Sequence, residues 1–398
     1  MNQPFKAVQV TDRVYWVGAI DWDLRNFHGY QTGRGTTYNA YLVMADKITL
    51  IDTVKAHFKK EMLGRIASVV DPRQIEYIVS NHSEMDHSGC LPEVIEAVQP
   101  AKVFVSPAGA KALGRYFGLS DLTVVKSGET CDLGQAKLIF QETKMLHWPD
   151  SMFSYLPEEQ LLFSQDAFGM HLASNERFLD QIDPFVWRYE AAKYFANILM
   201  PFSPLILALA KKLGELQWPI KIIAPDHGPI WRMNPGRAVE LYGQWSTRKP
   251  TRKAIVVYDT MWSSTARMAR TVADGLFDHG SPVTVMNLSV THRSDVVAEL
   301  LEAGALVVGS PTMNNMVFPS VADLLTYLRG LKPANLIGAA FGSYGWSGEA
   351  VKQIEQYLLE MKVELAAESV KANYAPDSGE LEQCYALGAK VAEKLGAN

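Results

Sequence analysis

The stretch "NHSEMDHSG", residues 81–89, collects four side chains that can bind a metal ion, those of His82, Glu84, Asp86 and His87. It follows directly on "IEYIVS", an apolar run that is typical of a buried strand. The whole chain has only nine histidines, so two of them this close together need a reason. An ordinary surface loop would carry one or two such residues, and four need a further explanation. The motif therefore predicts a metal site at the end of a strand.

Three other apolar runs in the first half of the chain also lead to a residue that can bind a metal. "ETKMLH" ends in His147, "LLFSQD" in Asp166 and "IIAPDH" in His227. Taken alone, each has an ordinary explanation as a packed histidine, a cap or part of a turn. Strand ends converge when their strands are neighbours in one sheet layer, and we expect that arrangement here. The predicted metal ligands are His82, Glu84, Asp86, His87, His147, Asp166 and His227.

The composition is that of an ordinary globular chain. It has 398 residues, 48% hydrophobic and 20% charged, which favours two domains. The net charge of −5, without a basic block, argues against nucleic-acid binding. No apolar stretch approaches the roughly 20 residues of a spanning helix, and the first residues lack the apolar core of a signal peptide, so we expect no membrane association and a cytoplasmic protein. Cys90, Cys131 and Cys384 lie too far apart to suggest a disulfide framework or a built-in iron–sulfur site.

The two halves of the chain follow different patterns. Up to about residue 245, short apolar strands alternate with irregular loops, with helices between some of them. The segment "QWSTRKPTRK", residues 244–253, is typical of a linker because it is charged and contains proline. After it, strands such as "AIVVYDT" and "ALVVGSPT" alternate strictly with helices, which predicts an open parallel sheet covered on both faces. Such sheets bind their ligands at the carboxyl ends of the strands.

Three loops at these strand ends form a second candidate site. "YDTMWSST", residues 258–265, offers hydroxyls and a helix start to a phosphate, although a Ser/Thr helix cap explains it as well. It lacks the glycines of dinucleotide and P-loop motifs, so a monophosphate fits better. "SPTMNN", residues 310–315, and "FGSYGWSG", residues 341–348, add flat side chains. The candidate residues are Thr260, Met261, Trp262, Ser263, Ser264, Thr265, Pro311, Thr312, Met313, Asn314, Asn315, Ser343, Tyr344, Gly345, Trp346, Ser347 and Gly348.

The motif H-x-E-x-D-H at residues 82–87, with His147, Asp166 and His227 downstream, resembles the metallo-β-lactamase fold in the form that flavodiiron proteins carry. The three loops of the second half resemble those of flavodoxin, so the resemblance covers essentially the whole chain. It implies an α/β architecture: a metallo-β-lactamase-like αββα sandwich at residues 1–248, which binds two irons, and a flavodoxin-like doubly wound parallel sheet at residues 253–398, which binds FMN.

The resemblance also assigns roles to individual residues. The two irons share an oxo or hydroxo bridge and the carboxylate of Asp166; the other ligands are His82, Glu84 and His147 for one iron and Asp86, His87 and His227 for the other. Hydrolytic relatives usually have a histidine where this chain has Glu84, and mixed carboxylate–imidazole sites suit iron. His28 and Tyr194 match positions that face the substrate pocket. His171 is a candidate for a place behind the ligands, and Trp148 and Trp346 for the lining of the approach.

The implied function is that of an electron-transport enzyme, an oxygen or nitric oxide reductase. Together a flavin and a diferrous pair store four electrons, enough to reduce dioxygen to water; two electrons reduce two nitric oxides to nitrous oxide. The resemblance implies a head-to-tail homodimer, and a tetramer is the alternative assembly. Since no rubredoxin-like or NADH-binding segment is recognisable, we expect a separate donor, most simply a rubredoxin. The rival function is a zinc-dependent hydrolase with an accessory flavodoxin-like module.

Overall fold

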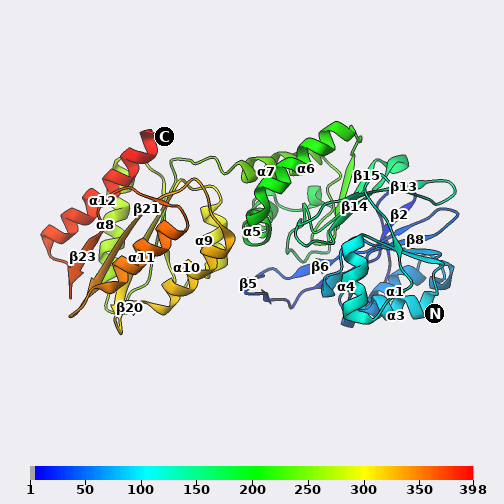
Figure 1. Ribbon diagram of the computed structural model, residues 1–398, viewed down its shortest axis with the longest axis horizontal. Coiled ribbons are helices and arrows are strands. Elements are labelled where there is room, and N and C mark those ends of the chain that lie inside the picture. The colour runs from blue at the N-terminus through cyan, green and yellow to red at the C-terminus, as the bar shows by residue number, and fades with distance from the viewer. Residues whose placement is uncertain (1–4, 398) are drawn as a thin grey trace. The chain divides into compact units, whose positions relative to one another are not determined.

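The computed structural model describes residues 5–397, and the chain divides into two compact units (Figure 1). The first unit contains the chain up to His28, Thr32–Tyr194 and Phe202–Gly243. The second contains Gly29–Gln31, Phe195–Pro201 and the chain from Gln244 onwards. Each unit has its own sheets and its own core of buried apolar side chains.

Two large sheets form the centre of the first unit. In spatial order, the first sheet contains β1 (Val8–Gln9), β2 (Val14–Trp16), β7 (Tyr41–Val43), β8 (Thr49–Ile51), β9 (Tyr77–Ser80), β10 (Lys102–Val105) and β11 (Thr123–Val124). The second contains β12 (Thr130–Asp132), β13 (Lys137–Glu142), β14 (Met152–Leu156), β15 (Leu161–Gln165) and β16 (Ile222–Pro225). A short ribbon pairs β3 (Ala19–Asp21) with β6 (Thr36–Tyr38), and β4 (Asn26–Phe27) is shorter still, whereas β5 (Tyr30–Gln31) belongs to the second unit.

The two sheets pack face to face around one apolar core. Tyr41 of the first sheet contacts Phe163 of the second at a ring-centroid distance of 5.3 Å, and Phe104 stacks on Phe140 at 5.8 Å. Each such ring removes about 150–250 Å² from water, which is why aromatic pairs dominate the energetics of a core. A second core lies on the other face of the first sheet, against α1 (Lys59–Ala67), α3 (Leu91–Val98) and α4 (Pro107–Phe117).

The remaining helices of the first unit complete a four-layer sandwich. Figure 1 shows α5 (Pro184–Tyr194) and α6 (Ser203–Leu216) on the side of β14 and α1, α3 and α4 on the side of β8, so helices flank both sheets. The expected αββα sandwich is therefore confirmed. The short α2 (Met85–Ser88) follows β9, and α7 (Gly236–Thr247) follows β16. Single turns of 3₁₀ helix lie at Ala56–Phe58, Pro72–Gln74, Pro157–Glu159 and Leu179–Gln181.

One expectation about this unit was wrong. The strands that carry the predicted ligands were expected to be neighbours in one sheet, but β9 belongs to the first sheet, whereas β13, β15 and β16 belong to the second. The sequence reading also missed β14, a fully buried strand with the sequence "MFSYL" that lies between β13 and β15. Strand pairing joins residues far apart in the chain, and alternation of residues along one strand carries no information about its partner.

A helical stretch at Pro184–Leu216 corrects a second expectation. Among the described residues, this is the one helical stretch that is long enough and apolar enough to cross a membrane, judged by length and composition alone. The sequence analysis expects no such stretch. Half of its most apolar window is buried inside the protein. The stretch is also interrupted by a π-helical turn at Phe195–Leu199 and a 3₁₀ turn at Met200–Phe202. Burial and interruption are typical of a core helix in a soluble protein.

The second unit is a doubly wound sheet, as expected. Its main strands, in spatial order, are β18 (Val283–Asn287), β17 (Ala254–Tyr258), β19 (Ala305–Met313), β21 (Ile337–Tyr344) and β22 (Glu364–Leu365), with β23 (Val370–Asn373) paired to β21 and β20 (Met316–Val317) to β19. All pairings except β19–β20 are parallel. The helices are α8 (Ser264–Asp278), α9 (Arg293–Leu300), α10 (Pro319–Leu331), α11 (Glu349–Glu360) and α12 (Ser378–Ala397). The strand order reverses direction at β17, which creates a crevice between the ends of β17 and β19.

Two glycines allow α8 and α12 to touch backbone to backbone. A Cβ atom on Gly275 of α8 would lie 2.1 Å from the Tyr385 carbonyl oxygen, and one on Gly388 of α12 would lie 2.1 Å from the Val272 carbonyl oxygen. No real Cβ is found that close to a backbone oxygen, and backbone cannot move aside as a flexible side chain can. The pair of glycines is therefore a condition for this helix packing.

We expect Gly275→Ala to lower the free energy of unfolding of the second unit by about 3 kcal/mol, because the added methyl group forces the two helices apart. Gly330→Ala is the matched control: Gly330 is exposed in α10, and nothing lies within 4 Å of the position of its Cβ. That variant should be as stable as the parent or gain about 0.5–1 kcal/mol. Urea unfolding followed by circular dichroism measures both, and equal midpoints for the two variants would contradict the role of Gly275.

Candidate metal centre

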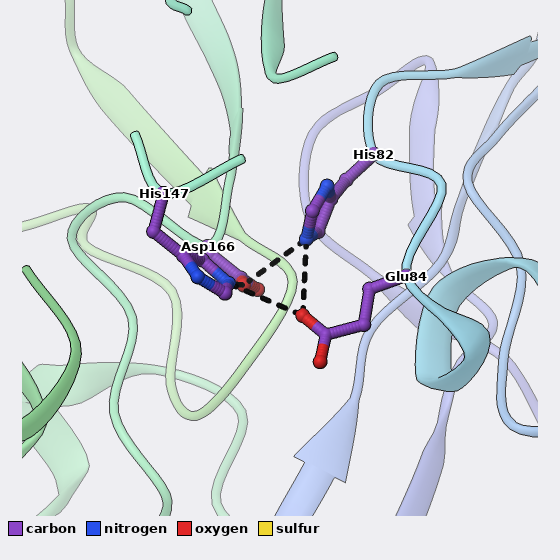
Figure 2. A group of neighbouring side chains, drawn as sticks. All are labelled: His82, Glu84, His147 and Asp166. Atoms are coloured by element: carbon purple, nitrogen blue, oxygen red, sulfur yellow. Dashed lines mark hydrogen bonds and ion pairs between the residues drawn. The ribbon is translucent and has the colours of Figure 1, made fainter. Parts of the chain in front are cut away.

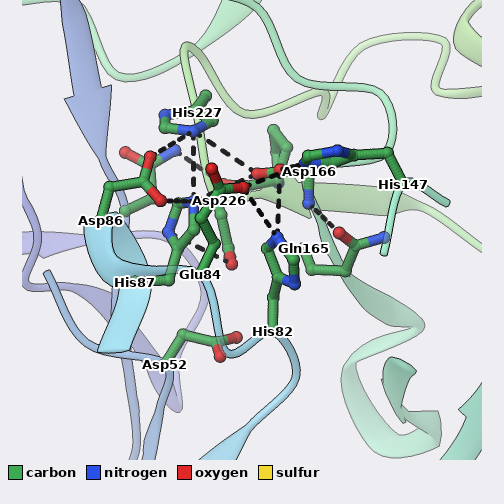
Figure 3. A network of polar contacts seen from close by, with 12 residues as sticks. Asp52, His82, Glu84, Asp86, His87, His147, Gln165, Asp166, Asp226 and His227 are labelled. Atoms are coloured by element: carbon green, nitrogen blue, oxygen red, sulfur yellow. Dashed lines mark hydrogen bonds and ion pairs between the residues drawn. The ribbon is translucent and has the colours of Figure 1, made fainter. Parts of the chain in front are cut away.

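The seven predicted ligands lie together in the first unit (Figure 3). They come from loops that follow β9, β13, β15 and β16 and from the short helix α2. Except for His147, which is partly buried, every one of them is at most 6% exposed. Both sheets contribute, because the ends of β9 on one sheet and of β15 and β16 on the other meet at the same edge of the sandwich.

The first group of ligands combines two imidazoles and two carboxylates (Figure 2). Nε2 of His147 lies 2.8 Å from Oδ2 of Asp166 and 3.2 Å from Oε2 of Glu84. Nε2 of His82 lies 3.3 Å from the same Glu84 oxygen and 3.6 Å from Oδ2 of Asp166. All four side chains thus present one atom each to a common point, with the atoms within 4.8 Å of one another.

The second group consists of Asp86, His87 and His227. Nε2 of His227 lies 3.2 Å from Oδ2 of Asp86 and 3.1 Å from Nε2 of His87. Asp166 also reaches this group, because its Oδ1 lies 3.2 Å from Nε2 of His87 and 3.4 Å from Nε2 of His227. Its other oxygen faces the first group. The carboxylate of Asp166 therefore lies between two clusters of nitrogen and oxygen atoms.

The chemistry of these side chains fits metal ions. Both oxygens of Asp86 and Oδ1 of Asp166 are buried and accept no hydrogen bond from the described residues 5–397. A buried carboxylate oxygen without a partner is costly, and a cation removes that cost. Negative charge on Asp86 and Asp166 raises the pKa of His87 to about 10, although burial alone would lower it. The negative charges that favour a proton on the His87 imidazole also favour a divalent cation bound to it instead of the proton.

The outer nitrogens of two ligand histidines are held by other groups, which leaves Nε2 to face inward. Nδ1 of His82 lies 3.1 Å from Oδ2 of Asp150, and Nδ1 of His227 donates to the carbonyl oxygen of Thr37 at 2.6 Å. The Asp150 oxygen also accepts from the backbone N–H and the hydroxyl of Ser83, both at 2.6 Å. Such partners fix the tautomer and orientation of a metal-binding imidazole. The sequence reading missed Asp150, whose only signal was its place three residues after His147 in "HWPD".

Two further buried carboxylates lie behind His87 and were also missed. Asp226 is 1% exposed, its Oδ2 lies 3.6 Å from Nδ1 of His87, and burial raises its pKa well above the ordinary value, with the charge of Asp52 acting in the same direction. Burial raises the pKa of Asp52 to about 6, although hydrogen bonds from the backbone and side-chain N–H groups of Asn81 favour its charged form. A single aspartate beside a strand has no sequence signal that distinguishes it from a cap.

Three further residues predicted for this site also lie beside the ligands. Nε2 of His28 is 3.2 Å from Oε1 of Glu84, on a side chain that is 75% exposed. Tyr194 is fully buried, with its ring 6.1 Å from that of His227, and its hydroxyl has no hydrogen-bond partner among residues 5–397. Burial raises the pKa of Tyr194 well above its ordinary value. The buried ring of His171 lies 4.7 Å from that of His227, and burial lowers its pKa, so it remains neutral.

The second candidate site lies at the carboxyl ends of β17, β19 and β21. In the first loop, Ser263 has a left-handed backbone with φ of +66° and directly precedes α8, and the buried hydroxyl of Thr260 has no hydrogen-bond partner in the described chain. Thr265 and Ser343 join this loop to the third one through a hydroxyl contact of 2.9 Å. The Thr260 hydroxyl, which has no hydrogen-bond partner in the described chain and lies close to the start of a helix, fits a phosphate group.

The other two loops differ in part from the expectation. Residues 310–313 belong to strand β19, and only Asn314 and Asn315, with φ of 52° and 62°, form the turn of a hairpin with β20. Asparagine tolerates this backbone, and two such residues are typical of a tight hairpin turn. Trp262 and Trp346 are 89% and 84% exposed, so two large flat side chains extend from the loops into solvent.

Comparison with known proteins agrees with both sites. Residues 36–228 match the model of the "ODP family beta lactamase", and residues 256–388 match that of flavodoxin. A nitric oxide reductase from Moorella thermoacetica is 46% identical over 99% of this chain and 100% of its own, and a rubredoxin-oxygen oxidoreductase from Megalodesulfovibrio gigas is 44% identical over 98% and 99%. This chain belongs to the flavodiiron protein family.

Two solved structures show the same likeness in three dimensions. Rubredoxin oxygen:oxidoreductase from Desulfovibrio gigas superposes with a TM-score of 0.97 at 44% identity, covering 98% of this chain and 99% of the other. The flavodiiron protein from Giardia intestinalis superposes with a TM-score of 0.95 at 33% identity, covering 98% and 97%. The likeness therefore extends over both units.

We expect Asp150→Asn to weaken Fe²⁺ binding by the metal-free protein by about 10- to 100-fold, because the amide no longer offers a charged acceptor to Nδ1 of His82. Asp121→Asn is the matched control, since Asp121 is exposed and remote from any ligand in sequence. Anaerobic titration calorimetry with Fe²⁺ measures both variants. If they bound Fe²⁺ equally well, Asp150 would have no role in holding the ligand.

Proposed function

We propose that this chain is a flavodiiron oxidoreductase that reduces dioxygen to water, nitric oxide to nitrous oxide, or both, with electrons from an external donor such as rubredoxin. The observation that carries the proposal is the position of Asp166 between two groups of buried imidazoles and carboxylates, in a chain that also has a flavodoxin-type sheet. The relatives named nitric oxide reductase and rubredoxin-oxygen oxidoreductase support both reactions.

The geometry supports two metal positions that share Asp166. In this proposal, the remaining ligands are His82, Glu84 and His147 for the first metal and Asp86, His87 and His227 for the second. His87 is included as a direct ligand because its Nε2, rather than its Nδ1, faces Asp86 and Asp166. The carboxylate of Glu84 favours iron over zinc, since mixed oxygen and nitrogen ligands suit iron redox chemistry. The same residue argues against the rival hydrolase function.

When bound, two irons supply open coordination positions and two electrons to the gas, and FMN supplies the other two electrons. The chain's own residues bind and orient the substrate. Tyr194 retains the proton on its hydroxyl, because burial disfavours the phenolate, so the hydroxyl is a hydrogen-bond donor with no other partner in residues 5–397. His28 connects Glu84 with solvent. These two side chains are the proposed catalytic residues.

FMN is proposed to bind at the strand ends of the second unit. Hydroxyls of Thr260 and Thr265 and the N-terminus of α8 would hold its phosphate. Tyr344, Trp346 and Trp262 would flank its ring with flat apolar surface, since two of these are almost fully exposed without a ligand. The remaining contacts would come from residues 261–264, 311–315 and 343–348.

The proposal includes an assembly and a location. The domains are residues 1–248 and 253–398, and the enzyme is a cytoplasmic head-to-tail homodimer or a tetramer built from it. Electron transfer requires the flavin of one chain to lie close to an iron pair, and a dimer provides that proximity between chains. A rubredoxin delivers electrons to the flavin.

Purified protein from iron-replete cells should contain two irons and one FMN per chain. It should consume dioxygen or nitric oxide when a reduced rubredoxin is supplied. Elemental analysis, the absorption spectrum and gas-electrode traces measure these three quantities. Zinc as the main metal, or a missing flavin, would contradict the proposed function.

Glu84→His should lower the ratio of iron to zinc bound and abolish gas reduction, because a neutral imidazole replaces a negative oxygen ligand. Glu84→Asp is the matched control, since it keeps the carboxylate and should keep the preference for iron. Metal content and gas consumption are measured together for both variants. If Glu84→His bound two irons and reduced gas at the parental rate, the carboxylate would not determine the choice of metal.

A further inference from the structure

Asn39 is a buried residue that contacts the loop bearing His227. It is 0% exposed and connects β6 with β7. Its Nδ2 donates to the carbonyl oxygens of Pro225 and Gly228 at 2.7 Å and 2.9 Å. Its backbone N–H donates to the carbonyl oxygen of Asp226 at 2.7 Å. One residue therefore binds three of the four carbonyl groups in the loop Pro225–Gly228.

Trp16 determines which way the Asn39 amide points. The indole Nε1 donates to Oδ1 of Asn39 at 2.8 Å. Since an indole can only donate, the oxygen of the amide must face Trp16 and the nitrogen must face the loop. The guanidinium groups of Arg65 and Arg177 lie 4.7 Å and 4.4 Å from the centre of the Trp16 ring, in the range of cation–π contacts. The indole is 1% exposed and thus fixed in place.

Thr37 also holds this loop. The carbonyl oxygen of Thr37 accepts from Nδ1 of His227 at 2.6 Å, and its hydroxyl accepts from the backbone N–H of Gly228 at 2.7 Å. Gly228 has φ of +76°, so the chain turns sharply directly after His227. The position of the imidazole then depends on how firmly the carbonyls on either side of it are held.

We propose that Asn39 is a positioning residue for His227, and through it for the second metal position; the inference rests on the proposed function of His227 as a ligand. The Asn39 side chain fixes the carbonyl groups of Pro225 and Gly228, one on each side of Asp226 and His227, at the same time. The distance from the imidazole Nε2 to Asp86 and Asp166 is set by that double contact. The first metal position, with His82, Glu84 and His147, does not depend on it.

The chemistry of this position requires an amide. Aspartate has the same shape but no N–H to donate, so the carbonyls of Pro225 and Gly228 would each lose a hydrogen bond and face a negative charge. Leucine would remove the same two hydrogen bonds and leave the Trp16 indole without its acceptor. Each unpaired buried group disfavours the native loop conformation. Tyr41 offers a matched comparison, because its hydroxyl donates to the same Pro225 carbonyl at 2.7 Å without touching Gly228.

The test is anaerobic calorimetric titration of the metal-free, flavin-loaded full chain with Fe²⁺, which resolves two binding steps. The variants are Asn39→Asp, Trp16→Phe, Tyr41→Phe and His227→Ala. We expect Asn39→Asp to weaken the second step by about 10- to 100-fold. Trp16→Phe removes a single hydrogen bond and should weaken it by about 3- to 10-fold. Tyr41→Phe should stay within about twofold of the parent, because Asn39 still holds both carbonyls. The first step should be unchanged in these three variants.

The outcomes test separately the role of Asn39 and the role of His227 as a metal ligand, on which the inference rests. If Asn39→Asp bound both irons as the parent does, or if Tyr41→Phe weakened the second step equally, Asn39 would be an ordinary structural residue. If Asn39→Asp did not fold, Trp16→Phe would decide, and an unchanged second step in that variant would overturn the inference. His227→Ala tests the basis separately: it should abolish the second step, and a parental titration would remove His227 from the proposed ligands whatever the Asn39 variants did.

Discussion

The carboxylate of Asp166 imposes the main constraint on the first unit. Its two oxygens face two different groups of imidazoles, and it is 2% exposed. A buried charge in this position is tolerable only if cations lie within reach on both sides. The ends of β9, β15 and β16 must therefore meet around it with little freedom, and the face-to-face packing of the two sheets provides that rigidity. The aromatic core between the sheets thus supports the metal centre.

The hydrogen bonds around the histidines follow from the same constraint. An imidazole ring that can rotate would place its inward-facing Nε2 at several positions. Asp150 and the Thr37 carbonyl prevent this by holding Nδ1 of His82 and of His227. The buried carboxyl groups of Asp226 and Asp52, whose pKa values are raised by burial, lie behind His87. The centre consists of inward atoms that can bind metal and an outer layer that orients them, and the outer layer is as deeply buried as the inner one.

Sequence alone predicted the inner layer and the fold far better than the outer layer. His82, Glu84, Asp86 and His87 stand out because they are crowded after an apolar run, and the strict alternation after residue 253 specifies a parallel sheet. Asp150 and Asn39 are single polar residues without a pattern, and only their long-range contacts give them a role. The assignment of β9 and β15 to different sheets was equally hidden, since pairing is decided by residues that are remote in the chain.

The contribution of both sheets to one centre has a consequence for how the protein matures. The ligands run from His82, directly after β9 of the first sheet, to His227, directly after β16, the last strand of the second. A chain emerging from the ribosome cannot close the centre until residue 227 has left the exit tunnel and β16 has joined β15. The second group of ligands is therefore completed late in the synthesis of the first unit, after all four members of the first group are already present in the chain.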